Sequence, residues 1–96
     1  MTELMEKRFK VKELKNDPSL INQEVTVKGW VRTLRAQKNF SFMEINDGSS
    51  LSNIQVILDA ETDIPTGSSV RVTGKLVASL GGKQSVEVQA REIEVL

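Results

Sequence analysis

Alternation of apolar and polar residues along most of the chain restricts its fold more than any other feature. Five segments show this period of two, and they cover residues 24–35, 38–46, 51–59, 69–79 and 85–96. The turn sequences Asp-Gly, Pro-Thr-Gly and Gly-Gly separate the later segments. Because successive side chains of a β-strand point to opposite faces, each segment is predicted to be a strand with one buried face.

The number and length of these strands predict a small barrel. The first segment is the longest, and Gly29 lies inside it. Glycine within a strand allows a bend or a close backbone approach, which a strand shared by two sides of a barrel requires. Five short strands with glycine-containing turns are typical of an all-β barrel that is closed or nearly closed. With 96 residues and 39% apolar content, the chain is expected to bury a single modest core.

The N-terminal residues are predicted to form an arm outside the barrel. Residues 11–16 favour one or two helical turns. The helix should end at Asp17, because a residue that precedes proline is disfavoured in helical conformation. We therefore divide the chain into an arm with a short helix over residues 1–20 and a barrel domain over residues 21–96.

Missing residue types exclude several kinds of site. The chain contains neither cysteine nor histidine, which excludes disulfides, thiolate metal sites and the usual zinc and copper ligand sets. We expect no cofactor and no metal, although an oxygen-ligand metal is not excluded. The chain has no apolar run of about 18 residues and no signal-peptide core at its start. These features predict a soluble, unprocessed cytoplasmic protein without membrane contact.

Charge is balanced over the whole chain but uneven along it. Thirteen basic and thirteen acidic residues cancel, and this balance by itself argues against a nucleic-acid partner. Residues 28–38, however, contain basic residues and no acidic one: Lys28, Arg32, Arg35 and Lys38. This basic stretch is either a solvated strand edge, where lysines oppose aggregation, or a surface that binds phosphates.

The predicted second and third strands place an aromatic ring and an amide on one outer face. Met43 shares the apolar face with Ile45, so Phe40 and Phe42 fall on the face toward water. A loop or the N-terminal arm could cover Phe40, and Phe42 is the better candidate for stacking. Gln55 faces the same side across the hairpin. Basic residues, an outward aromatic residue and an amide on these strands form the arrangement by which OB-folds bind oligonucleotides.

Several segments form an ordered set with consistent spacing: residues 27–33, 46–51, 55–56, 67–74 and 84–90, with Arg35 and Phe42 between them. Together they resemble the N-terminal anticodon-binding domain of class IIb aminoacyl-tRNA synthetases, and specifically the asparaginyl members. The similarity covers about residues 21–96. It implies a five-stranded OB-fold Greek-key barrel, tRNA as the partner and a role in protein biosynthesis. The whole protein would be an ATP-dependent asparagine–tRNA ligase.

The resemblance also implies which residues contact tRNA. In that family an aromatic residue stacks on the central anticodon base, a uridine, which an arginine and a glutamine read. The matching positions are Phe42, Arg35 and Gln55. Alternation alone does not show where Arg35 points. The further tRNA-binding candidates are the basic Lys28 and Arg32, and Lys83 with Gln84 in a loop that is either a plain turn or a second contact.

Two features differ from the family pattern. Residues 60–66 are too few for the full helix that the family often places after the third strand. Either Val11 and Leu14 of the arm close that end of the barrel, or the chain is a shortened or engineered version. No catalytic domain follows Leu96, so we expect this chain to lack enzymatic activity and to act beside the catalytic domain of the full-length protein.

Two other functions compete with this interpretation. Small barrels can hold metal-dependent nuclease sites, and Glu44, Asp47, Asp59 and Asp63 could supply oxygen ligands. This hypothesis is disfavoured, because Asp47 belongs to an Asp-Gly turn and no histidine supplies a base. The other competitor is an excised, reconstructed or engineered OB-fold scaffold that binds single-stranded nucleic acid or a protein.

Overall fold

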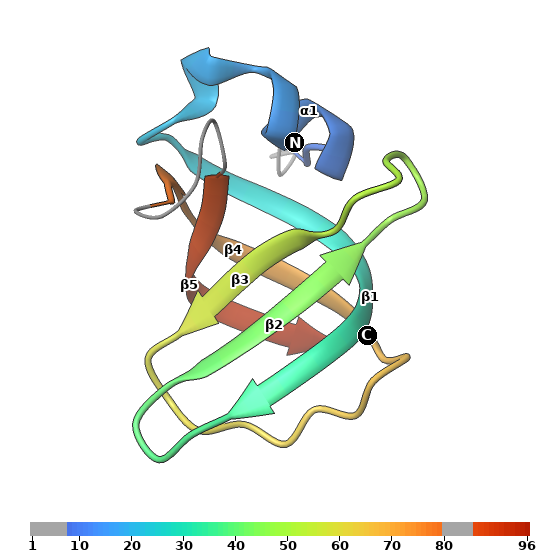
Figure 1. Ribbon diagram of the computed structural model, residues 1–96, viewed down its shortest axis with the longest axis vertical. Helices are drawn as coiled ribbons and strands as arrows, with labels where there is room; N and C mark the ends of the chain where they lie inside the picture. The colour runs from blue at the N-terminus through green and yellow to red at the C-terminus, as the bar shows by residue number, and fades with distance from the viewer. Residues whose placement is uncertain (1–7, 80–85) are drawn as a thin grey trace, which may run out of the picture.

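Five strands close into a barrel in the computed structural model, which describes residues 8–79 and 86–96. The elements are α1 (Val11–Asn16), the 3₁₀ helix η1 (Pro18–Leu20), β1 (Glu24–Ala36), β2 (Ser41–Asn46), β3 (Ile54–Leu58), β4 (Ser69–Ala78) and β5 (Val86–Val95). The strand order around the barrel is β1-β2-β3-β5-β4 (Figure 1). All neighbouring pairs are antiparallel except β3 and β5. The predicted all-β OB-fold barrel is confirmed.

The long strand β1 belongs to two sides of the barrel. Its first half pairs with β4 and its second half with β2. The strand bends past the end of β2 at Gly29, where an added Cβ would lie 2.6 Å from the carbonyl oxygen of Asn46. Only glycine allows two backbones to approach this closely. Gly29 therefore has the role that the sequence predicted.

The apolar faces of the strands meet inside the barrel. The following strand residues are at most 1% exposed: Val25, Val27, Val31, Met43, Ile45, Ile54, Val56, Val70, Val72, Leu76 and Val88. The helix α1 adds Val11 and Leu14 to the same core. The predicted inward faces of the second and third strands are therefore correct at their centres, and Phe42 and Gln55 lie outside the core.

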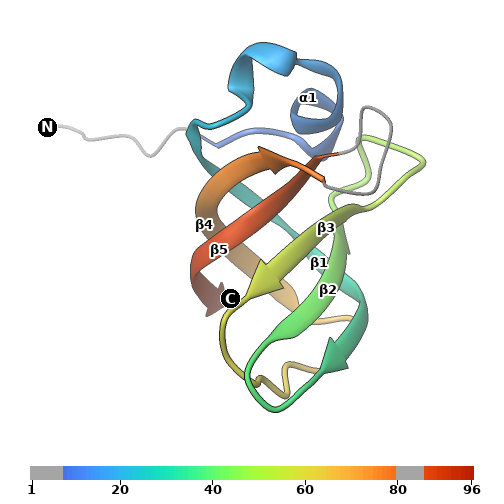
Figure 2. The same ribbon diagram turned by 60° about the vertical axis from the view of Figure 1, so that its left-hand side comes forward.

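The two ends of the barrel are closed by different segments. The helix α1 lies at the end where β2 connects to β3 (Figure 2), and the Val11 N–H donates to Asp47 Oδ2 at 3.0 Å. The connection from β3 to β4 lies at the opposite end, and its Ile64 packs against the core. One of our two expectations was that Val11 and Leu14 of α1 cover the barrel end from which the helix after β3 is missing. This expectation is wrong, because the β3–β4 connection itself covers that end and α1 covers the opposite one.

Two strands begin later than alternation predicted. Residues 38–40 belong to the β1–β2 turn, which the Gln37 N–H closes by donating to the Phe40 carbonyl at 2.8 Å. Residues 51–53 belong to the β2–β3 connection, where the Asn46 side chain donates to the Ser50 carbonyl at 3.2 Å. Local hydrogen bonds in these turns replace the strand ladder.

Within the described residues, no helix is long and apolar enough to cross a membrane.

Candidate nucleic-acid interface

The register of β1, β2 and β3 brings four side chains onto one outer face, three of which the sequence suggested as tRNA contacts. Arg35 lies opposite Phe42, and Glu44 lies opposite Gln55. Residues directly opposite in an antiparallel pair share a face. With their neighbours they line a shallow hollow of about 250 Å³, which we call the Phe42 hollow: Thr33, Arg35, Phe42, Met43, Glu44 and Gln55. The sequence prediction that Arg35, Phe42 and Gln55 lie together agrees with this geometry.

Arg35 reaches the hollow because of an irregularity in β1. The β1–β2 register shifts between Val31 and Thr33, so Arg32 is an extra residue in β1 at this point. This shift reverses the alternation beyond it, which is why alternation alone left the direction of Arg35 open. The guanidinium carbon of Arg35 lies 5.8 Å from the Phe42 ring centroid, within the range of a cation–π contact. Arg32 is exposed but does not line the hollow.

A second ring supports Phe42. The Phe40 and Phe42 centroids are 5.1 Å apart with an interplanar angle of 85°, an edge-to-face contact. Both rings are half-buried. The described part of the N-terminal arm, with α1, lies at the other end of the barrel, so it does not cover Phe40 (Figure 2). Phe40 thus helps to hold the Phe42 ring in one orientation.

Glu44 lines the hollow, although the sequence suggested it only as an oxygen ligand of the disfavoured metal site and not as an RNA contact. Its Oε1 accepts a hydrogen bond from Asn53 Nδ2 at 3.2 Å. Asn53 Oδ1 in turn accepts from Asn46 Nδ2 at 2.9 Å. Alternation did indicate that Glu44 lies on the same face as Phe42, because Glu44 follows Phe42 by two residues on the same strand.

The other predicted contact residues do not join the hollow. Lys28 lies opposite Arg71 of β4 and lines a separate hollow of about 480 Å³ with Arg8, Phe9, Lys10, Glu13 and Asp47. The bend of β1 therefore divides the basic stretch between two surfaces, and Lys38 is exposed in the β1–β2 turn. Lys83 and Gln84 lie outside the described residues.

Hydrogen bonds within the fold engage the carboxylate of Asp47. Burial alone would raise its pKa, but hydrogen bonds from the Ser49 side chain and backbone and from the Val11 N–H outweigh burial and lower the pKa below its usual value. Asp59 and Asp63 are exposed in the β3–β4 connection. In residues 8–79 and 86–96, no three acidic groups gather where they could hold a metal ion.

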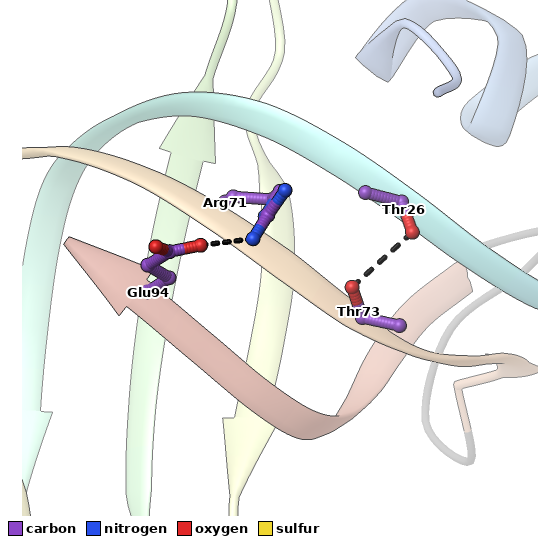
Figure 3. A network of polar contacts seen from close by, with 4 residues as sticks. All are labelled: Thr26, Arg71, Thr73 and Glu94. Carbon is purple, nitrogen blue, oxygen red and sulfur yellow. Dashed lines mark hydrogen bonds and ion pairs between the residues drawn. The ribbon is translucent and has the colours of Figure 1, made fainter. Parts of the chain in front are cut away.

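The outer surface over β1, β4 and β5 has a different character. Arg71 forms an ion pair with Glu94, and Thr26 and Thr73 share a hydrogen bond of 3.2 Å (Figure 3). A second ion pair joins Arg91 to Glu24. We call this surface the paired wall and define it by the residues just named: Glu24, Thr26, Arg71, Thr73, Arg91 and Glu94.

Known proteins are similar to this chain in both sequence and fold. Residues 25–96 match the profile of the tRNA anti-codon family, described as an OB-fold nucleic acid binding domain. An asparagine–tRNA ligase of Cytophaga hutchinsonii is 43% identical over 94% of this chain and 21% of the ligase. The corresponding ligase of Clostridium tetani is 43% identical over 93% of this chain and 21% of its own length. The chain thus spans about a fifth of the length of these curated relatives.

Solved structures show the same barrel at lower identity. Asparaginyl-tRNA synthetase from Pyrococcus horikoshii, complexed with asparaginyl-adenylate, has a TM-score of 0.79 and 24% identity over 96% of this chain and 23% of that chain. OBody AM1L10, bound to hen egg-white lysozyme, has a TM-score of 0.74 and 22% identity over 99% of this chain and 98% of that chain. At these identities the likeness concerns the fold alone.

Proposed function

This chain belongs to the OB-fold nucleic acid binding domain family, and we propose that it is the anticodon-binding domain of an asparaginyl-tRNA synthetase. Curated relatives at 43% identity that are named asparagine–tRNA ligase support this proposal. ATP-dependent ligation of asparagine to tRNA would be carried out by a catalytic domain in the rest of such a protein, in the cytoplasm. The chain described here would contribute tRNA recognition and no catalytic step.

The observation that carries the proposal is the position of Arg35 over Phe42 with Gln55 in the same hollow. The Phe42 ring offers a face on which a base of the anticodon loop stacks, a contact worth about 1–3 kcal/mol. The Gln55 amide offers a donor and an acceptor to the edge of that base. The Arg35 guanidinium offers several donors in one plane to a carbonyl oxygen or phosphate. We propose the central uridine of the anticodon as this base.

The remaining basic residues would contact the RNA backbone. Arg32 is exposed beside the hollow, where we assign it to a phosphate. Lys28 lies on the first half of β1 and lines a separate hollow, so any phosphate it contacts is a different one. Lys83 and Gln84 lie outside the described residues, and we keep them as candidates for a second contact, to a base beside the central uridine, on the sequence alone.

Titration of the chain with an anticodon stem-loop RNA, followed by NMR, tests the proposal. Phe42→Ala should weaken binding by about 1–3 kcal/mol because the stacking face is lost. Its stability should change little, since Phe42 lies outside the core. Trp30→Ala is the matched control, because Trp30 is an exposed aromatic residue outside the hollow. Unchanged affinity in Phe42→Ala, or equal losses in both variants, would contradict the proposal.

A further inference from the structure

A negatively charged side chain lies in the middle of the proposed RNA-binding face. Glu44 of β2 is half-buried and lies opposite Thr33 of β1 and Gln55 of β3. A carboxylate repels the phosphates that the neighbouring arginines attract. A negative charge at this position lowers the affinity for RNA in general. Its presence on this face is therefore better explained by a role in choosing the base than by a role in holding phosphates.

A chain of amide contacts fixes the orientation of this carboxylate. The Gly48 N–H donates to Asn46 Oδ1 at 2.6 Å, so Asn46 must present its Nδ2 to Asn53 Oδ1 at 2.9 Å. Asn53 is thereby left with its Nδ2 toward Glu44 Oε1 at 3.2 Å. Among the described residues no hydrogen bond reaches Glu44 Oε2. One oxygen is thus held by the fold, and the other is available to accept a hydrogen bond from a ligand.

Gln55 alone cannot distinguish uracil from cytosine. An amide side chain carries one acceptor and one donor group, and rotation by half a turn exchanges them. Uracil presents an N3–H donor beside an acceptor at position 4, whereas cytosine presents an N3 acceptor beside a donor amino group. A glutamine can therefore match either edge. A carboxylate cannot donate, so its preference does not reverse in this way.

Resting on the proposed function, we infer that Glu44 accepts the N3–H of the bound base and thereby sets the preference for uracil. The strand order places the donors of Arg35 on one side of Glu44 and the amide of Gln55 on the other. This order of donor, acceptor and donor complements the uracil edge, which presents O2, N3–H and O4. In cytosine the N3 lone pair would face the carboxylate.

Glu44→Gln tests the inference with little change in shape. The substituted amide keeps an oxygen that accepts from Asn53, but it presents a donor where Oε2 was. We measure the affinities of two stem-loop RNAs that differ only in uridine or cytidine at the central position. The unmodified chain should prefer uridine by at least about tenfold, as expected for a hydrogen bond to a charged group. Glu44→Gln should reduce this preference to about threefold or less, mainly through tighter binding of cytidine.

Two further variants separate the possible results. Glu92→Gln removes an exposed charge of β5 outside the hollow, and it should leave the uridine preference unchanged. Glu44→Ala should also lower the preference, here through weaker binding of uridine. An unchanged preference in folded Glu44→Gln and Glu44→Ala would overturn the inference while leaving the proposed function intact. Absence of any uridine preference in the unmodified chain would overturn the inference as well and would also contradict base reading by the Phe42 hollow.

Discussion

The paired wall and the Phe42 hollow use their charged side chains in different ways. On the wall, Arg71 pairs with Glu94 and Arg91 pairs with Glu24. In the hollow, Arg35 lies over the Phe42 ring and forms no ion pair among the described residues. Charges on the wall thus neutralise one another, whereas the cation of the hollow can still meet an anion.

This difference explains why a balanced composition is compatible with binding to RNA. Equal numbers of basic and acidic residues argue against a nucleic-acid partner only if the charges are evenly mixed. Here two arginines pair with two glutamates on the wall, whereas Arg35 in the hollow has no ion-pair partner among the described residues. Exposed ion pairs of this kind contribute only about 0–1 kcal/mol each to stability. The wall and the hollow can therefore be tested separately by substitution.

The largest effect is expected where β1 passes from the wall to the hollow. Gly29→Ala would place a Cβ 2.6 Å from the Asn46 carbonyl oxygen. The backbone must then shift, which should distort both the paired wall and the Phe42 hollow. We expect the free energy of unfolding to fall by roughly 2–3 kcal/mol, measured by chemical denaturation. Gly67→Ala is the control, because its φ of 89° is unfavourable but no atom lies within 4 Å. The control should lower the free energy of unfolding by only about 1 kcal/mol. Equal losses of stability in the two variants would disprove the close approach at Gly29.

Two arginines, one in each region, provide the next comparison. Arg35→Ala should weaken stem-loop binding by about tenfold, because it removes a charged donor beside the base. Arg71→Ala should leave the affinity within about twofold and reduce stability by no more than about 1 kcal/mol, as for an exposed ion pair. Isothermal calorimetry and denaturation measure the two quantities. Equal losses of affinity in both variants would remove the distinction between the wall and the hollow.

Arg32 provides a smaller effect at the edge of the hollow. If Arg32 contacts one phosphate, Arg32→Ala should reduce the slope of log affinity against log salt concentration by about 0.7, the value for single strands. Titrations at several salt concentrations give this slope. A slope equal to that of the unmodified chain would mean that Arg32 makes no phosphate contact.

The sequence predicted the outward faces of Phe42 and Gln55 because strand alternation is a local property. Phe42 and Gln55 face outward for the same reason that Met43 and Val56 face inward. The direction of Arg35 was not predictable, because the irregularity before Thr33 depends on how β1 pairs with β2. The place of α1 was also beyond prediction, since it depends on a hydrogen bond from Val11 to the distant Asp47.

The smallest expected effect concerns the turn that supports β2 and α1. The pKa of Asp47 is lowered in the folded state, so its stabilising contribution is present above the usual carboxyl pKa of 3.8 and is lost as pH falls through the lower folded value. Stability should therefore decrease in acid, and Asp47→Asn should show a weaker decrease. Denaturation midpoints between pH 6 and about pH 2 measure this difference. Identical pH profiles would exclude a contribution from Asp47.

The most direct test of the account is to map the RNA contact on the whole barrel by NMR. A stem-loop with central uridine is added in steps while the backbone and side-chain amide signals of the chain are followed. We expect the largest shifts at Arg35, Phe42 and Gln55, with small shifts over the paired wall. Shifts that cluster at Arg71 and Glu94, or that spread evenly over both regions, would contradict the claim that RNA binds at the Phe42 hollow.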